Sequence, residues 1–307
     1  MEKILIKAFA FVMIIIGGYF LKKVKFFKDD DYRLVSKIVL NMTLPAAIIS
    51  SFGKFEKGGS IFLLVSLGLG CNLIMIWLGY MAAKKQDNKV KALYMLNFAG
   101  YNIGTFTLPF VQSFLGTTGV VTTCMFDVGN AISCTGGSYA LTSAVISNSG
   151  EKFSAKEFIK KLLCSVPFMS YMIMLMFVSF NIKVPALIVS VSDVIAGANG
   201  FMSMLMIGLM FKIEFKYDYM SKAGVILLSK YLASAVMSFI IYKFFPLPLE
   251  VRQVLVILLF SPVSAMASVY TEKCGSDIGI ASFSNSVSIL ISIGIITGLL
   301  VFMGIGV

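Results

Sequence analysis

The chain has 307 residues, of which 58% are hydrophobic and 13% charged, with a mean hydropathy of +0.91 and a net charge of +11. Soluble domains carry about 25% charged residues, so a water-soluble fold would leave much of this apolar surface unburied. The basic residues fall between apolar stretches rather than on one face, which argues against nucleic-acid binding. This composition predicts an all-α integral membrane protein in contact with the lipid bilayer.

Apolar stretches long enough to cross a membrane recur along the chain, each near the ~20 residues that a hydrocarbon core of about 30 Å requires. We count ten spans, at 4–21, 33–51, 60–82, 92–115, 118–146, 162–181, 185–211, 223–244, 250–272 and 277–305. The first resembles a signal peptide, but no small-x-small cleavage site precedes the basic cluster 22–28, so we interpret it as a retained helix. The connections are short and leave no room for a soluble domain.

Basic residues are distributed unevenly between the two sets of loops. Most of them follow odd-numbered spans, at 22–33, 84–91, 152–161 and 212–222, whereas the other loops hold few, such as Lys54. Positive loops stay on the cytoplasmic side. We therefore expect a multi-pass protein of the cytoplasmic (plasma) membrane with both termini outside.

Several kinds of chemistry are excluded by residue type. The sequence contains no histidine, which rules out a Ser-His-Asp triad, a His-ligated metal and a histidine proton relay. The five cysteines show no C-x-x-C spacing and are interpreted as packing residues. We expect no enzyme activity, no metal site and no cofactor.

The longest polar connection, 148–161, divides the chain into two halves of five spans, 1–150 and 151–307. An odd number of spans per half places the halves in opposite orientations. If the halves are homologous, they form an inverted repeat, the plan of many secondary transporters.

The fourth span of each half contains proline, Pro109 in the first half and Pro262 in the second. A proline inside a helix costs about 3 kcal/mol, and in lipid the freed carbonyls must find partners in protein or a wet cavity. We therefore expect broken helices, with simple kinks as the alternative. Counted back from Gly116 and Gly275, Pro262 aligns with the neighbourhood of Asn102 rather than with Pro109.

Two broken helices offer amide donors to an anion and carbonyl acceptors to a cation. The candidate substrate-binding residues lie around the breaks and in the second span: Asn41, Tyr101, Asn102, Thr105, Pro109, Ser261, Pro262, Ser264 and Ser268. The three serines are spaced to share one helical face. Bonding to their own helix backbone is the alternative role for serine and threonine.

Ionisable and amide side chains within the spans are candidates for coupling or bracing. Asp127 lies in the fifth span, followed by Asn130; such a carboxylate by default faces a partner or a cavity. Coupling to a proton or to sodium and bracing of neighbouring helix ends are equal alternatives for it. Asn97 adds polar capacity, and Lys230 is a candidate partner of a substrate carboxylate or a structural cation.

Motifs along the whole chain resemble the auxin efflux carrier family, which includes malonate and malate permeases and belongs to the bile-acid/arsenite/riboflavin transporter superfamily. The resemblance rests on NMTLPAAIISSF at 41–52, NIGTFTLP at 102–109, FDVGNAI at 126–132 and SPVSAMASVYTEKCGSDIGIASFSNSVSILIS at 261–292. The last stretch is the most specific, because family members commonly carry a proline, a small-polar run, an acidic-basic pair and a glycine there.

The resemblance implies a ten-helix inverted repeat with a scaffold domain (spans 1, 2, 6 and 7) and a transport domain (spans 3–5 and 8–10). Spans 4 and 9 would be crossover helices. The family's crossover asparagine, which binds the substrate carboxylate, corresponds to Asn102. Many relatives have Gly-x-Pro where this chain has Thr107-Leu108-Pro109, and no asparagine follows Pro262 here.

The residues and the resemblance together predict a secondary active transporter of a small organic anion, such as malate, malonate or an auxin-like acid, moving by an elevator or rocking mechanism. A membrane receptor or sensor on the same fold, and a sodium-coupled symporter of the bile-acid type, are the alternatives. A channel is disfavoured because no helix carries charged rings. Whether the chain forms a homodimer is left open.

Overall fold

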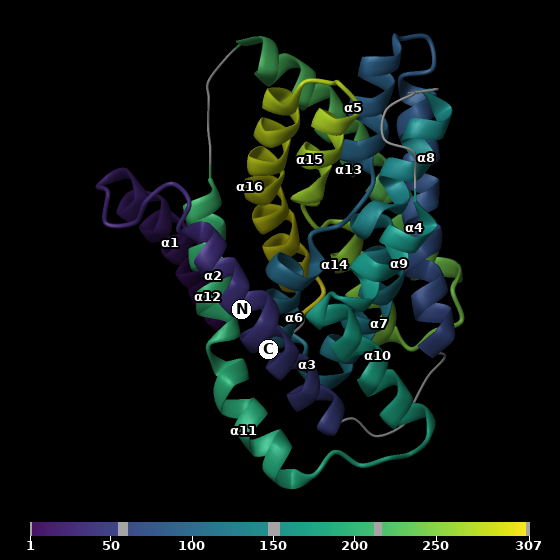
Figure 1. Cartoon of the computed structure of the whole chain (residues 1–307). Helices are drawn as coiled ribbons and strands as arrows, with labels where there is room; N and C mark the ends of the chain where they lie inside the picture. The colour runs from purple at the N-terminus through teal and green to yellow at the C-terminus, as the bar shows by residue number, and fades with distance from the viewer. Residues whose placement is uncertain (1, 55–60, 147–153, 212–216, 305–307) are drawn as a thin grey trace.

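The computed structural model describes residues 2–54, 61–146, 154–211 and 217–304, and within these residues the chain is helical and contains no strand (Figure 1). The helices run mostly along one long direction of the molecule. The predicted boundary between the halves, at 150 and 151, lies outside the described residues.

Six helical segments of the described chain are long and apolar enough to cross a bilayer. They are α1 (Glu2–Lys23); α2 (Tyr32–Ile38) with the π-helical turn η1 (Val39–Thr43) and α3 (Leu44–Gly53); α4 (Ile61–Ala82); α11 (Ala186–Gly197) with α12 (Asn199–Met210); α13 (Tyr217–Phe244); and α16 (Ile278–Phe302). A seventh span results if α9 (Ala155–Leu163) and α10 (Val166–Ser179), which bend by 73° at a short break, are taken together.

The fourth, fifth and ninth expected spans are interrupted. They consist of α5 (Asn88–Phe98), η2 (Ile103–Thr107) and α6 (Leu108–Phe114); of α7 (Gly116–Ile132), η3 (Ser133–Gly137) and α8 (Ser138–Val145); and of α14 (Leu249–Leu259) and α15 (Met266–Lys273). We call residues 99–102 the first break and residues 260–265 the second break.

Pro109 does not mark the interruption of the fourth expected span, contrary to the sequence-based expectation. The chain is non-helical at 99–102, and Pro109 lies in the first turn of α6, directly after η2. There the N–H of Leu108 donates to the carbonyl of Ile103, five residues back. A proline cannot donate to the turn before it, and this wider turn accommodates it without ending the helix. The same Thr-Leu-Pro sequence stands at the end of η1, where Thr43 is the last residue of η1 and Pro45 lies in the first turn of α3.

The predicted polar connection 148–161 is shorter than expected, because its second part forms the amphipathic helix α9. The Ser154 side chain accepts a hydrogen bond from the backbone N–H of Glu157. This is the Ser-x-x-Glu capping signature, which satisfies the otherwise unpaired donors of a helix start.

The helices pack in two groups. α1 packs against α12, and α3 against α10 and α11; separately, α4 packs against α5 and α7, and α13 against α14 and α16. In Figure 1, α1, α2, α11 and α12 lie on the left and α4, α5, α7 and α8 on the right.

Glycines allow close helix contacts within each group. A Cβ added to Gly18 of α1 would lie 3.2 Å from the Cα of Gly208 in α12. A Cβ on Gly68 of α4 would collide with the carbonyl of Phe126 in α7, and one on Gly129 would collide with the backbone of α4. Small residues let membrane helices approach this closely, so both pairs fix the helix register.

Candidate functional site

The two breaks meet and pair their backbones. Tyr101 and Val263 form an isolated antiparallel β-bridge. The N–H of Asn102 donates to the carbonyl of Pro262 (3.0 Å), and the N–H of Ser264 donates to the carbonyl of Gly100 (3.3 Å). The two bonds are reciprocal, so a two-fold rotation that exchanges the breaks would make Gly100 equivalent to Pro262 and Asn102 equivalent to Ser264. Pro262 thus corresponds to the region of Asn102 and not to Pro109, as in the sequence-based alignment.

Two asparagine side chains hold the first break. The Oδ1 of Asn130 accepts from the N–H of Tyr101 (3.0 Å), and its Nδ2 donates to the Tyr101 carbonyl (2.9 Å). The Oδ1 of Asn72 in α4 accepts from the N–H of Gly100 (2.7 Å), and its Nδ2 donates to Asn130 (3.2 Å). Gly100 has a φ of +73°, a conformation that favours glycine. The backbone groups freed by the break therefore have side-chain partners within the membrane.

The second break is held by α16 in the same manner. The N–H of Val263 donates to the Oγ of Ser288 (3.0 Å), and the Nδ2 of Asn285 donates to the Val263 carbonyl (2.7 Å). The residue at the centre of each break is thus bound at both its N–H and its carbonyl by side chains of the next expected span, α7 for Tyr101 and α16 for Val263. Buried backbone groups without such partners would each cost about 1–3 kcal/mol.

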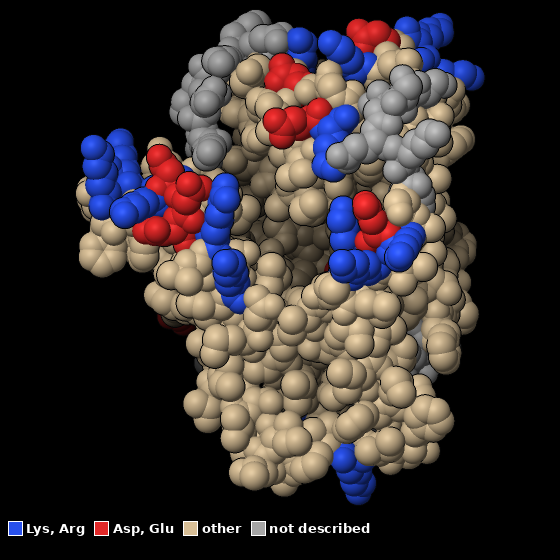
Figure 2. Space-filling model, in the orientation of Figure 1, with Lys and Arg blue, Asp and Glu red and all other residues tan. Residues whose placement is uncertain are grey.

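A cavity of about 560 Å³ ends at the paired breaks. Its lining comes from both breaks, from α2, η1, α7 and α10, and, among basic residues, from Lys161 and Lys273. Figure 2, in the orientation of Figure 1, shows a hollow in the surface with Lys and Arg side chains on either side of it. Asp127, Tyr101, Asn102, Thr105, Asn130 and Ser264 are the predicted site residues among its lining.

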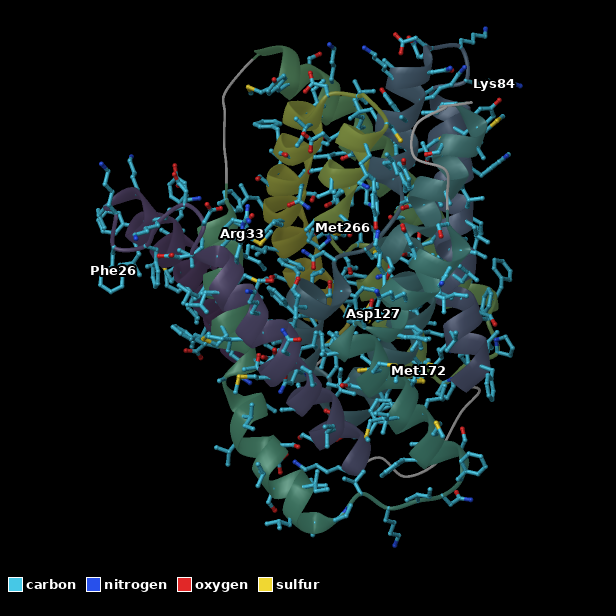
Figure 3. All side chains as sticks on the ribbon, in the orientation of Figure 1. Phe26, Arg33, Lys84, Asp127, Met172 and Met266 are labelled. Carbon is cyan, nitrogen blue, oxygen red and sulfur yellow. The ribbon has the colours of Figure 1, made fainter. Side chains whose placement is uncertain are left out.

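Asp127 lies near mid-height of the molecule, within the helices (Figure 3). Only 8% of its surface is exposed, and both carboxylate oxygens accept hydrogen bonds: Oδ1 from the Nδ2 of Asn130 (2.8 Å) and Oδ2 from the hydroxyl of Tyr171 (2.7 Å). Tyr171 belongs to α10, in the packing group of α3. The carboxylate therefore links the first break, through Asn130, to the other group of helices.

Asn102 lines two cavities. Besides the larger one, it contributes to a cavity of about 190 Å³ bordered by Ser268, Asn285 and residues of α12. Its Oδ1 accepts a hydrogen bond from the hydroxyl of Thr105 (2.6 Å). The predicted binding residue thus lies where the two cavities adjoin, at the start of η2.

The serines of the second break do not share a helical face, so that part of the prediction is wrong. Residues 260–265 are not helical, because the backbone of Pro262 pairs with the first break instead of continuing α14. The Oγ of Ser261 lies 2.6 Å from the Oγ1 of Thr107 and is buried, Ser264 lines the larger cavity, and Ser268 lines the smaller one.

Six predicted residues line neither cavity: Ser261 and Pro262 of the second break, and Asn41, Asn97, Pro109 and Lys230. Asn41 is exposed and donates to the carbonyl one turn earlier in its own helix, as does the buried Asn97. Pro109 is buried in α6. The Nζ of Lys230 is buried and donates to the carbonyl of Phe98 (2.9 Å).

Four residues of the site were not predicted from the sequence: Asn72, Tyr171, Asn285 and Ser288. Two of them carried a usable signal, because Asn72 and Asn285 are amides inside apolar spans, where each polar group needs a partner. Tyr171 had no such signal, since one tyrosine among apolar residues also suits plain packing.

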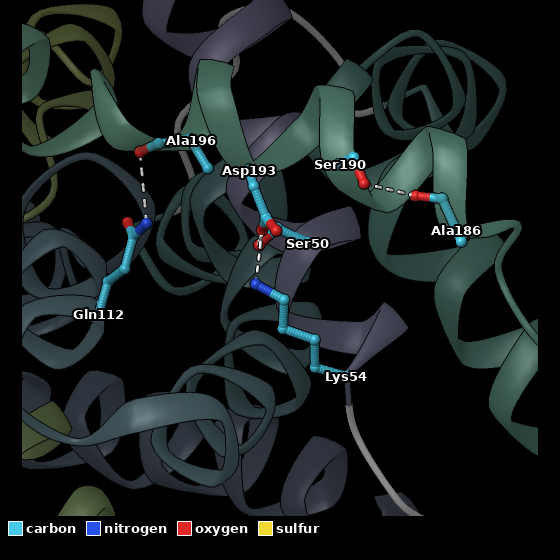
Figure 4. Close-up of polar contacts among 7 residues, drawn as sticks. All are labelled: Ser50, Lys54, Gln112, Ala186, Ser190, Asp193 and Ala196. Atoms are coloured by element: carbon cyan, nitrogen blue, oxygen red, sulfur yellow. Dashed lines mark hydrogen bonds and ion pairs between the residues drawn. The ribbon is translucent and has the colours of Figure 1, made fainter.

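Away from the cavity, polar contacts join α3, α6, α11 and α12, and Figure 4 shows those of Asp193 and the one between Gln112 and Ala196. Asp193 of α11 accepts from the side chains of Lys54 and Ser50. Gln112 of α6 donates to the carbonyl of Ala196 (3.3 Å) and accepts from the Nδ2 of Asn199 (3.3 Å). The Gln112 contacts connect the two packing groups.

Apolar membrane-length helices around a cavity that contains polar side chains define a multi-pass integral membrane protein. Residues 4–300 match the family model described as membrane transport protein. The chain therefore belongs to that family, the auxin efflux carrier family, and is a membrane transporter. A comparison with curated proteins finds no match.

Proposed function

We propose that the protein is a secondary active transporter of a small organic anion, which binds where the two breaks meet. The observation that carries this proposal is the cavity of about 560 Å³ that ends at the paired breaks and contains Asn102 and Ser264. Broken helices inside a membrane present backbone donors and acceptors that a solute can use, and carriers place their substrate sites there.

Ten spans in a 5+5 inverted repeat form the architecture of this proposal. The three interrupted segments, added to the six continuous spans and the bent pair α9–α10, supply the required number. The reciprocal backbone bonds of Asn102 and Ser264 support a two-fold relation between the halves. The packing group of α1, α3 and α10–α12 would be the scaffold domain, and the group of α4–α8 and α13–α16 the transport domain.

The cavity opens to the cytoplasm in this proposal. Lys161 of α9 and Lys273 at the end of α15 line it, and both belong to basic segments that the positive-inside rule places on the cytoplasmic side. The contacts of Gln112 with α11 and α12 would close the opposite side. Transport then requires these contacts and the Tyr171–Asp127 bond to break as the transport domain moves by an elevator or rocking motion.

The anion would be attracted by the basic residues beside the cavity and held by groups at the breaks. Positive charge at the mouth of a cleft raises the local concentration of anions. Asn102 supplies an amide side chain, and Thr105 and Ser264 supply hydroxyls. Malate, malonate and aromatic carboxylates are the candidate substrates.

Asp127 is the coupling residue in this mechanism, and the proton is the coupling ion. Protonation would remove a negative charge from the cavity that receives the anion. Each oxygen of this carboxylate already accepts one hydrogen bond, from Asn130 or Tyr171, which leaves fewer acceptor positions for a sodium ion.

The proposal is tested by uptake of radiolabelled malate, malonate and aromatic carboxylates into proteoliposomes. Proton, sodium and potential gradients are imposed separately. Uptake of one of these anions that follows a proton gradient is the expected result. Binding detected by thermal stabilisation, without uptake or counterflow under any gradient, would overturn the carrier and favour a receptor.

A further inference from the structure

Lys230 is a fully buried lysine close to the first break. It lies in α13, and its side chain has 0% exposure. Its Nζ donates to the carbonyl of Phe98 (2.9 Å) and lies 5.0 Å from the centre of the Tyr101 ring. The ion pairs of the described residues join Arg33 to Asp30 and Lys54 to Asp193, and Lys230 takes part in neither.

Burial of an ammonium group without a carboxylate partner is unfavourable unless other groups replace its hydration. Phe98 is the last residue of α5, so its carbonyl belongs to the negative end of the helix dipole. The face of the Tyr101 ring adds a second attraction for a cation. Together these groups form a cation site made by a helix end and an aromatic ring, and it is occupied by a side chain.

The location of this site relates it to anion binding. Asn102 follows Phe98 by only four residues, and the break between them starts at the C-terminal end of α5. A helix C-terminus carries roughly half a negative charge, which would repel an anion at Asn102. The ammonium group of Lys230 opposes this charge from outside the cavity, since Lys230 is absent from the lining of both cavities.

We propose that Lys230 is a tethered cation that takes the place of a bound monovalent cation at the C-terminal end of α5 and so prepares the first break for an anion. Lys230 is then a positioning residue that never touches the substrate. The inference rests on the proposed function and deepens it, because it predicts that anion binding at this site needs no free cation beside α5.

The test removes the positive charge of Lys230 by substitution and then offers a small cation from the buffer in its place. Lys230→Met keeps most of the length of the unbranched side chain and removes its charge, whereas Lys230→Arg keeps the charge. Lys243→Met, an exposed lysine at the end of the same helix, is the matched control. Uptake is measured for whichever labelled anion (malate, malonate or an aromatic carboxylate) the wild type transports. It is measured in choline buffer and again with sodium, potassium or methylammonium, under an imposed membrane potential.

We expect the wild type and Lys243→Met to transport equally in all these salts. Uptake by Lys230→Met in choline should be about tenfold or more below that of the wild type. One of the small cations should restore about half of the lost uptake, because it returns a positive charge to the end of α5. Lys230→Arg should retain uptake within about threefold of the wild type. Full uptake by Lys230→Met in choline would overturn the inference, as would a loss that no small cation restores.

A second measurement separates this inference from the carrier proposal. The melting temperatures of purified Lys230→Met and of the wild type in detergent are compared with and without methylammonium. A small cation should raise the melting temperature of Lys230→Met more than that of the wild type. Equal shifts would overturn the cation site, whereas wild-type protein without uptake under any gradient would overturn only the carrier.

Discussion

The two breaks reach the same backbone pairing with different surroundings. The first has no proline, contains Gly100 at positive φ, and is held by Asn72 of α4 and Asn130 of α7. The second contains Pro262, and the N–H and carbonyl of Val263 at its centre are bound by Ser288 and Asn285 of α16. Similar geometry therefore does not need similar residues, provided that each freed N–H and carbonyl finds a partner.

Charge distinguishes the breaks more strongly than geometry does. Asp127 precedes Asn130 by three residues, and the residue three before Asn285 is Ser282, which lines the smaller cavity. Lys230 bonds the helix end at the first break. The first break is thus flanked by two ionisable side chains, Asp127 and Lys230, whereas the position in α16 that corresponds to Asp127 holds the uncharged Ser282.

The largest expected effect comes from the asparagines that hold the breaks. Asn130→Ala would remove partners of the Tyr101 backbone and of Asp127, a loss of about 3 kcal/mol or more, whereas Asn285→Ala would leave the Val263 carbonyl unpaired at about 1–3 kcal/mol. Thermal unfolding of the purified variants in detergent measures both. Equal losses would contradict the unequal support of the two breaks.

Asn102 and Ser264 occupy matched positions, so their alanine variants compare the two breaks at the binding site. Asn102→Ala should lower uptake about 30-fold, because an amide contact to the anion is lost, and Ser264→Ala about threefold. Uptake into proteoliposomes is measured at equal amounts of inserted protein. Unchanged uptake by Asn102→Ala would remove this residue from the site.

Asp127→Asn tests whether the charge of the first break carries coupling. Accumulation driven by a proton gradient should fall about tenfold, whereas exchange of labelled for unlabelled substrate should stay within about threefold, since the amide keeps the shape of the carboxylate. Ser282→Ala, at the matched position, should leave gradient-driven uptake intact. Accumulation by Asp127→Asn at the wild-type level would restrict Asp127 to bracing.

The smallest expected effect concerns tyrosine hydroxyls beside the breaks. The hydroxyl of Tyr101 is buried without a hydrogen-bond partner among the described residues, whereas that of Tyr231 donates to the carbonyl of Ser288 (2.9 Å). Tyr101→Phe should therefore leave stability unchanged or higher by about 1 kcal/mol, and Tyr231→Phe should lower it by a similar amount. Thermal unfolding of both variants measures these changes. A loss of stability in Tyr101→Phe alone would show that its hydroxyl has a hydrogen-bond partner.

Prediction from the sequence succeeded where one residue type carries a strong constraint. The aspartate in an apolar span had to face a cavity or partner, and Asp127 lines a cavity and bonds Asn130 and Tyr171. It failed where several backbone conformations suit the same residues. A proline in an apolar span predicts a break, but Pro109 lies in the first turn of α6, where the π-helical turn η2 accommodates it. The spacing of Ser261, Ser264 and Ser268 predicts one helical face, but residues 260–265 are not helical.

The sequence by itself determined the membrane environment, the helical class, the family, and the places where helices are interrupted near Asn102 and Pro262, because these depend on composition and local residue types. Only the tertiary structure decided that Asn130 binds the backbone of Tyr101, that Ser264 pairs with Gly100, and that Lys230 lies at the end of α5. These contacts join segments about 30 to 160 residues apart, and their register is set by helix packing and by the need of every backbone group freed in lipid to find a partner.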